Sequence, residues 1–254
     1  MNSKTILSRT AFHRASVLIK TSPYQLRTHK KIGHRLLATS QSNKQSDFEL
    51  TLLDHALTKV PEHGWTKAAL AQAANDLGYS SAAHGIAEPI TLISHFMDRA
   101  LDNTLVEVDD QLHELPSEHQ QLRLICRTRL RQTLPLVKRW PEAAAILAQP
   151  KNLPLAMSQL ARMSSEFWYL TGDQATRINW YAKRSGLAAA YLASEMYMCE
   201  DGSPEHCDTW AFLDRRLEEL MEMQVAGTKT LDFANQFTRN FYNILASRGF
   251  ISRN

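Results

Sequence analysis

The sequence predicts an all-α protein, and three observations lead to this class. Glycine occurs only 9 times in 254 residues, about half its usual frequency of roughly 7%. No stretch alternates polar and apolar residues as a half-buried strand does. Apolar residues instead recur with helical spacing from residue 48 onward, first at Leu50, Leu53, Leu57 and Val60. We therefore expect about nine to ten helices and no sheet.

The first predicted helix carries those four residues on its buried face and should end at Pro61 and Gly64. Thr66 is placed to cap a second helix over residues 67–77, which Gly78 would stop. Its buried stripe is expected to hold Ala68, Leu70, Ala71, Ala74 and Leu77.

Further helices follow between Pro and Gly residues, which mark the joints. A short segment covers residues 81–86, and Pro89 opens a long helix through Leu92, Phe96 and Leu105. The remaining helices are expected at residues 122–138, 142–149, 155–170, 174–200, 207–224 and 230–247.

The basic residues are concentrated in the first 46 positions, which contain no acidic residue. Nine of the 29 Lys and Arg residues lie there, together with twelve Ser and Thr residues. This composition is typical of a mitochondrial transit peptide, and we expect cleavage between Arg35 and Ser46. The alternative is a basic arm that binds RNA or DNA. The body from Asp47 keeps 20 basic and 26 acidic residues, a charge of about −6.

The remaining totals exclude several classes of protein and fit a reducing compartment. The hydrophobic content of the whole chain, 44%, excludes a disordered protein. Three cysteines, Cys126, Cys199 and Cys207, are too few for a disulfide framework. No apolar run approaches the ~18 residues of a membrane-spanning helix.

Residues 47–104 have the layout of a helix-turn-helix of the TetR repressor type. Two short helices flank the turn at Glu62–Trp65, and a third short segment follows Gly78. DNA binding requires basic side chains for the phosphates. This region contains eight acidic residues and only Lys59, Lys67 and Arg99. We expect the fold without nucleic-acid binding; a ligand-responsive DNA-binding regulator is the alternative.

Catalytic and metal-binding motifs are absent from the sequence. There is no phosphate-binding loop, dinucleotide fingerprint, nucleophile elbow or zinc-protease motif. Asp109, Asp110, His113 and Glu114 are interpreted as a solvated helix end, and Cys199, His206 and Cys207 as ordinary thiols and imidazole. We expect no enzyme activity, metal or cofactor. An unrecognised enzyme that uses Asp173 or His206 is the competing hypothesis.

An aromatic segment over residues 167–184 stands out in the middle of the chain. Neighbouring Trp180 and Tyr181 point about 100° apart on a helix, so one can face the core while the other is exposed. Exposed aromatic rings beside arginine are typical of protein interfaces, and core packing is the alternative. Arg184 requires an anion, which is either a carboxylate or a lipid phosphate.

The last predicted helix has an apolar, aromatic face and a basic flank. Phe237, Phe241, Ile244 and Leu245 share that face, and no acidic residue follows Asp232. This pattern is typical of a helix that lies in a membrane interface. Packing of the same face on the protein's own core is the alternative.

Taken together, these segments resemble the mitochondrial accessory proteins of ubiquinone biosynthesis, a family of TetR-like lipid-binding proteins. The resemblance spans about residues 48–250. The stretches that carry it are residues 62–65, 150–154, 168 with 172–174, 179–184 and 208–216.

The resemblance implies a non-enzymatic homodimer that binds isoprenoid quinone intermediates or phospholipid at the matrix side of the inner membrane. It implies one protein partner, the di-iron demethoxyubiquinone hydroxylase. Trp180, Tyr181, Phe167 and Asp173 would form the partner-binding surface, and Arg184 would contact lipid. The chain would divide into a transit peptide (1–46), a lipid-binding helical domain (47–228) and a membrane-associating helix with its tail (229–254).

Overall fold

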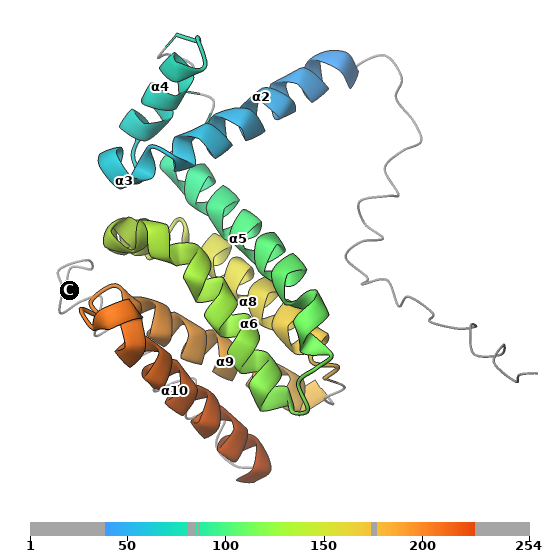
Figure 1. Ribbon diagram of the computed structural model, residues 1–254. Helices are drawn as coiled ribbons and strands as arrows, with labels where there is room; N and C mark the ends of the chain where they lie inside the picture. Colours follow the sequence, from blue (N-terminus) through green and yellow to red (C-terminus); the bar gives the residue numbers. More distant parts are fainter. Residues whose placement is uncertain (1–38, 81–84, 86, 174–176, 227–254) are drawn as a thin grey trace, which may run out of the picture. The chain divides into compact units, whose positions relative to one another are not determined.

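The computed structural model describes residues 39–80, 85, 87–173 and 177–226 (Figure 1). Every regular element in these ranges is a helix, which confirms the predicted all-α class. The chain divides into two units, Met1–Ser46 and Asp47–Asn254, and the second holds nearly all the described residues. None of the described helices combines the length and the apolar character needed to span a bilayer. The predicted segment 81–86, apart from Gly85, and the predicted helix 230–247 lie outside the described residues.

The first half of the second unit packs around one apolar core. Its elements are residues 47–57 of α2 (Thr39–Leu57), α3 (Val60–His63), α4 (Lys67–Asp76), the start of α5 (Pro89–Leu112), the 3-10 helix η2 (Leu134–Arg139) and α7 (Trp140–Leu147). Three aromatic rings meet in this core. The centroid of the Trp65 ring lies 5.7 Å from that of Phe96 and 5.8 Å from that of Trp140. We refer to this as the first core.

Two expectations about the first helix are wrong. Leu50 is 52% exposed, and Leu52 is buried in its place, because adjacent apolar residues offer two possible faces. The helix also ends at Leu57, before the expected stop, and Pro61 lies in the first turn of α3. Proline is well tolerated there because the first turn of a helix leaves its N–H groups unpaired. Gly64, with φ of +66°, ends α3.

Helix α4 begins after Thr66 and is followed by Gly78, which has φ of +79°, as expected. The Thr66 hydroxyl, however, donates to the His63 carbonyl at 2.9 Å and does not cap the helix. Its buried residues are Ala69, Leu70, Ala73 and Ala74, so Ala68 and Ala71 were assigned to the wrong face. Alanines on both sides of the helix make the spacing ambiguous, and only the neighbouring helices decide which side is buried.

The expected helix over residues 122–138 is two elements. Helix α6 (Glu118–Thr133) starts earlier, where the Ser117 hydroxyl accepts from the Gln120 N–H at 3.3 Å. It gives way to η2 at Leu134, because Pro135 lacks the N–H that would continue the α-helix.

A second apolar core is formed by the later helices of this unit, and we refer to it as the second core. It is formed by the later part of α5, by α6, α8 (Leu153–Leu170) and α9 (Arg177–Met198), and by α10 (Cys207–Ala226). Helix α10 packs along both α9 and α6 (Figure 1). Gly186 permits the close approach of α9 and α10, since a Cβ at this position would meet Leu220 Cδ1 at 2.5 Å.

A buried polar group joins the two cores, and the sequence pattern did not reveal it. The Arg129 guanidinium lies 5.7 Å from the Phe96 ring of the first core and 5.9 Å from the Tyr191 ring of the second. Glu195 accepts from the Tyr191 hydroxyl at 3.0 Å and from Thr133 at 3.4 Å. Burial raises the pKa of Glu195, and the nearby Arg129 opposes this rise. One arginine of the basic helix is therefore a core residue.

The beginning of α10 depends on Asp201. Its carboxylate accepts from the Ser203 and Thr209 N–H groups, both at 2.8 Å. Burial acts to raise the pKa of Asp201, but these hydrogen bonds and those of the two hydroxyls outweigh it and hold the pKa well below its ordinary value.

We expect Asp201→Ala to lower the free energy of unfolding by about 1–2 kcal/mol at pH 7, because two N–H groups at the helix start lose their acceptor. A depressed pKa stabilises the fold only while the carboxylate is ionised. The difference from wild type should therefore shrink as the pH falls below about 4. Urea unfolding at pH 7, 5 and 3 measures it, and a difference that stays constant over this range would contradict the assignment.

Candidate functional site

The turn between α8 and α9 places the charged residues of the candidate site. Gly172 has φ of +78° and follows the last turn of α8. Its N–H donates to the Tyr169 carbonyl at 3.1 Å, and the Asp173 N–H donates to the Trp168 carbonyl at 3.2 Å. This pair of bonds is the Schellman motif, which needs a left-handed residue at the position of Gly172. It holds Asp173 directly beyond the helix end.

Asp173 is a buried carboxylate that holds two cations of α9. Its side chain is 3% exposed and lies 2.7 Å from Lys183 Nζ and 3.5 Å from Arg184 Nη1. Lys183 Nζ also lies 3.9 Å from Glu118 Oε2 at the start of α6. A buried charge is tolerated when it is paired in this way. Removing Asp173 would leave Arg184 without its carboxylate and Lys183 with Glu118 alone.

Trp168 makes two contacts with Lys183, one of the two cations that Asp173 holds. Its side chain is fully buried, and its Nε1–H donates to the Lys183 carbonyl at 3.0 Å. The Lys183 ammonium lies 4.5 Å from the centre of the same ring. The indole thus binds Lys183 twice, through a hydrogen bond to its backbone and a cation–π contact to its side chain.

Arg184 links the buried carboxylate to the exposed aromatic pair. Its guanidinium carbon lies 4.0 Å from the centre of the Trp180 ring, and Nη1 donates to the Trp180 carbonyl at 3.3 Å. Burial lowers the pKa of Arg184, and the Asp173 carboxylate opposes this effect. Of the two anions considered for Arg184, the structure contains the carboxylate. Contact with a lipid phosphate remains a prediction.

Trp180 and Tyr181 are both exposed, at 37% and 71% of their surface. Their rings form an edge-to-face pair with centroids 4.7 Å apart. The expectation that one ring could face the core is not met, because neither is buried, and the Trp180 ring contacts the Arg184 guanidinium. Two aromatic rings held by a buried salt bridge make a rigid apolar surface of the kind found at the centre of protein interfaces. We refer to Trp180 and Tyr181 as the aromatic pair.

The prediction that Phe167 belongs to the partner-binding surface is wrong, and the Asp173 side chain is also buried. Phe167 is fully buried in the second core, where its ring lies 6.4 Å from that of Tyr191. A buried ring has no surface for a partner, so Phe167 is not part of the proposed contact. It shares α8 with Trp168, and the two adjacent aromatics both face inward. The side chain of Asp173 is nearly as buried and pairs with Arg184, so its expected part in a partner surface is at most indirect, through Arg184.

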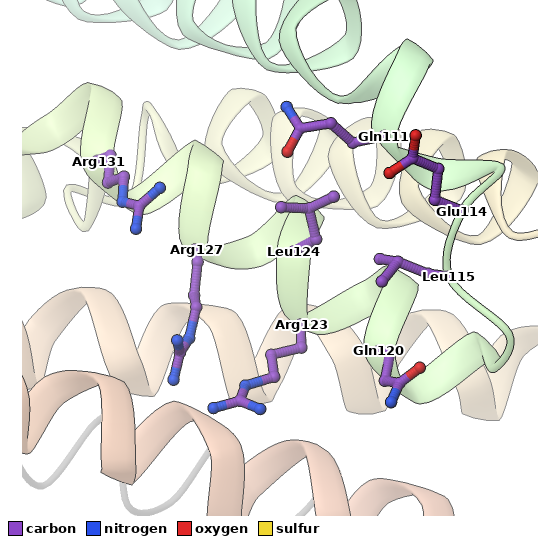
Figure 2. A pocket seen from close by; sticks show the side chains of 8 residues that line it. All are labelled: Gln111, Glu114, Leu115, Gln120, Arg123, Leu124, Arg127 and Arg131. Atoms are coloured by element: carbon purple, nitrogen blue, oxygen red, sulfur yellow. The ribbon is translucent and has the colours of Figure 1, made fainter.

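A hollow of about 440 Å³ lies beside α6 and the end of α5 (Figure 2). Three arginines of α6 line it, with two glutamines and Glu114, and Leu115 and Leu124 supply apolar surface. This lining is too polar for an isoprenoid chain. The spacing of Arg123, Arg127 and Arg131 in the sequence could have revealed the hollow, but nothing in the sequence places Asp214 of α10 against two of them.

The helix-turn-helix region offers little to DNA. Lys59 lies 2.5 Å from Asp76 and lowers the pKa of that carboxyl to about 2. Arg99 lies 2.8 Å from Asp54. Two of the region's three basic side chains are thus engaged by carboxylates within the protein rather than directed at phosphates.

Two further sequence-based predictions concern metal binding and membrane contact. The described residues contain no group of His, Cys, Asp and Glu side chains arranged to hold a metal ion, and this includes Asp109–Glu114 and Cys199–Cys207. The predicted membrane-contact residues Phe237, Phe241, Ile244 and Leu245 lie outside the described residues.

The fold and the exposed aromatic pair define a class of protein, a TetR-like helical protein with a surface suited to a partner. A TetR transcriptional regulator from Nitrosomonas europaea ATCC 19718 has a similar fold, with a TM-score of 0.55 over 69% of this chain and 98% of that one, at 16% sequence identity. This likeness concerns the fold alone and confirms the TetR-like architecture expected from the sequence.

The sequence comparisons identify the family. The COQ9 family model matches residues 153–224, which run from α8 into α10 and include the aromatic pair. The chain is 39% identical to the ubiquinone biosynthesis protein COQ9, mitochondrial, of Rattus norvegicus over 181 residues, 68% of this chain. It is 34% identical to COQ9-B of Xenopus laevis, with 75% of this chain and 72% of that protein covered. The chain belongs to the COQ9 family, as its motifs indicated.

The match to the mammalian relatives is partial. The chain spans 58% of the rat protein and 57% of the human protein, to which it is also 39% identical. The relatives are named as mitochondrial proteins of ubiquinone biosynthesis.

Proposed function

We propose that this protein is a non-enzymatic accessory factor of ubiquinone biosynthesis in mitochondria. It binds an isoprenoid quinone intermediate or a phospholipid at the matrix side of the inner membrane. There it presents the quinone intermediate to the di-iron demethoxyubiquinone hydroxylase. Family membership supports the pathway, and residues 1–46, which lack acidic residues, support import.

One observation carries the partner assignment: the aromatic pair is exposed although its surroundings are fixed. An unconstrained surface tryptophan would gain from turning its ring inward, whereas Trp180 is held outward by Arg184 and, through it, by Asp173. A rigid, partly exposed pair loses little conformational freedom on binding, which favours affinity. The acidic charge of the body, about −6 from Asp47 onward, leaves nucleic acid as a poor partner.

The membrane part of the proposal depends on chemistry and sequence. A polyprenylated quinone is too apolar to leave a bilayer unaided, so its carrier must touch the membrane. The apolar face of residues 229–254 supplies a candidate contact through Phe237, Phe241, Ile244 and Leu245. We further propose a homodimer, as the resemblance implies.

Reconstitution tests the proposed function. Hydroxylase is mixed with vesicles that contain demethoxyubiquinone, with and without this protein, and product is quantified by mass spectrometry. We expect the protein to increase hydroxylation and to produce none by itself. Turnover by the protein alone would favour an enzyme, and an unchanged hydroxylase rate would refute presentation.

The ligand is tested separately by extraction of lipids from protein purified without detergent. We expect an isoprenoid quinone intermediate or a phospholipid to co-purify in an amount comparable to the protein. Folded protein that yields neither class of lipid would exclude the carrier role, whatever the outcome with the hydroxylase.

A further inference from the structure

The hollow of Figure 2 is lined by an arginine row that the proposed function does not use. Arg123, Arg127 and Arg131 stand at i, i+4 and i+8 and therefore share one face of α6. The close-up shows Arg123 and Arg127 extending from α6 toward α10 (Figure 2). Three guanidinium groups on one wall make this a cationic hollow on a body that is acidic overall.

A single carboxylate serves two of these arginines. Asp214 Oδ2 accepts from Arg123 Nη2 at 2.6 Å and from Arg127 Nη2 at 2.8 Å. Asp214 and Glu114 together bring two negative charges against three positive ones. The positive charge of the hollow is thus only partly neutralised.

Two N–H donors of these arginines also have no acceptor among the described residues. The Nε atoms of both Arg123 and Arg127 are buried without a hydrogen-bond partner within the described part of the chain. A buried donor without an acceptor costs free energy, so the pairing with Asp214 does not satisfy these two arginines fully. Burial also lowers the pKa of Arg127, with Asp214 opposing, so an anion beside it would stabilise the charged form.

Arg131 is the third arginine that lines the hollow, and Trp210 of α10 lies close to it. Arg131 is exposed and makes no ion pair with any described residue. The guanidinium carbons of Arg127 and Arg131 both lie 5.9 Å from the centre of the Trp210 ring. The indole itself is held by a hydrogen bond from Nε1 to the Glu205 carbonyl at 2.9 Å. A fixed ring therefore contacts both cations, and the N–H groups of Arg131 remain without a carboxylate partner among the described residues.

We propose that this hollow binds a phosphate group, which we call the α6 phosphate site. A phosphate offers several acceptor oxygens and two negative charges, and arginine forks match its geometry. The volume of about 440 Å³ accommodates a phosphorylated small molecule, and Leu115 and Leu124 can contact an apolar portion of it. The phosphate belongs either to a soluble compound or to a lipid headgroup, and the two sources are separable by experiment.

Calorimetric titration of the full chain with inorganic pyrophosphate at low ionic strength tests the site. Arg131→Gln should weaken binding about tenfold, because one charge-assisted contact is lost while no ion pair of the fold is broken. Asp214→Asn should strengthen binding several-fold, because it removes the carboxylate that competes for Arg123 and Arg127. Arg99→Gln, an exposed arginine in the first half of the body, is the matched control and should bind as wild type does.

The outcomes separate the α6 phosphate site from a purely structural cluster. Opposite effects of Arg131→Gln and Asp214→Asn support the proposal. Equal weakening by Arg131→Gln and Arg99→Gln would show general charge attraction and overturn it, as would the absence of binding by wild type. Since Asp214→Asn can impair folding, the comparison of Arg131→Gln with Arg99→Gln decides the matter by itself.

Vesicle flotation identifies the source of the phosphate. Phosphatidylcholine vesicles with and without phosphatidic acid are incubated with wild type and Arg131→Gln. Capture of wild type but not of Arg131→Gln by phosphatidic acid vesicles supports a lipid headgroup. Equal capture of both proteins, together with pyrophosphate binding that depends on Arg131, supports a soluble phosphate compound. Absence of any dependence on Arg131 in both assays overturns the site.

Discussion

Tyr181→Ala is expected to weaken binding to the di-iron hydroxylase by about 30-fold or more, which corresponds to a loss of about 2 kcal/mol at a central interface residue. The side chain is 71% exposed, so the free energy of unfolding should change by no more than about 0.5 kcal/mol. Pull-down and surface binding measurements, each paired with a thermal melt of the same preparation, give both quantities.

Trp180→Ala should abolish the same interaction, with a modest loss of stability of about 1 kcal/mol because Arg184 loses the ring above it. Tyr79→Ala is the matched control, since Tyr79 is 52% exposed and packs on Phe48 in the first half of the body. It should bind the hydroxylase normally. If Tyr181→Ala lowered stability and binding together, the aromatic pair would be a packing element instead of a docking surface.

Trp168→Ala is expected to lower the free energy of unfolding by about 3–5 kcal/mol, the usual cost of removing a fully buried large aromatic ring. The variant also loses the hydrogen bond to the Lys183 carbonyl and the cation–π contact with the Lys183 ammonium. Urea unfolding of the full chain measures this change.

Trp168→Phe separates packing from hydrogen bonding. It keeps an aromatic ring and removes the N–H donor, so the Lys183 carbonyl loses the hydrogen bond from the indole and a smaller loss of about 1 kcal/mol is expected. A loss below about 1 kcal/mol for Trp168→Ala would show that Trp168 does not support the cluster of Asp173, Lys183 and Arg184.

Helix positions were more predictable than helix faces. The start of α4 after Thr66 and the position of Gly78 behind it were predicted correctly, because backbone preferences act locally, whereas Gly64 ends the short helix α3 and not the first predicted helix. Leu50 and Ala68 were assigned to buried faces wrongly, because neighbouring apolar residues allow more than one face. Which face is buried depends on the helices packed against it, and spacing within one helix does not contain that information.

For the candidate site, too, the sequence predicted the segment but not which of its residues are buried or paired. The segment 167–184 was identifiable from its aromatic and charged residues, and Arg184 was expected to need an anion. That Asp173 is this anion, and that Phe167 is buried, follow only from the turn at Gly172, which folds α9 back beside α8. The link from Asp214 to Arg123 joins residues 91 positions apart and is invisible to any local pattern.

The sequence by itself determined the all-α class, the acidic body behind a basic N-terminal segment, the membership in a family of ubiquinone biosynthesis proteins and the segment that holds the aromatic pair. These properties depend on composition, helical period and short motifs, which are local. Only the tertiary structure decided that Trp180 and Tyr181 are both exposed and that Phe167 and Arg129 are core residues. It also decided that three arginines of α6 line one hollow and that two of them pair with a carboxylate of α10. Burial and charge pairing are properties of whole helix packing, since they arise between residues that are distant in the chain.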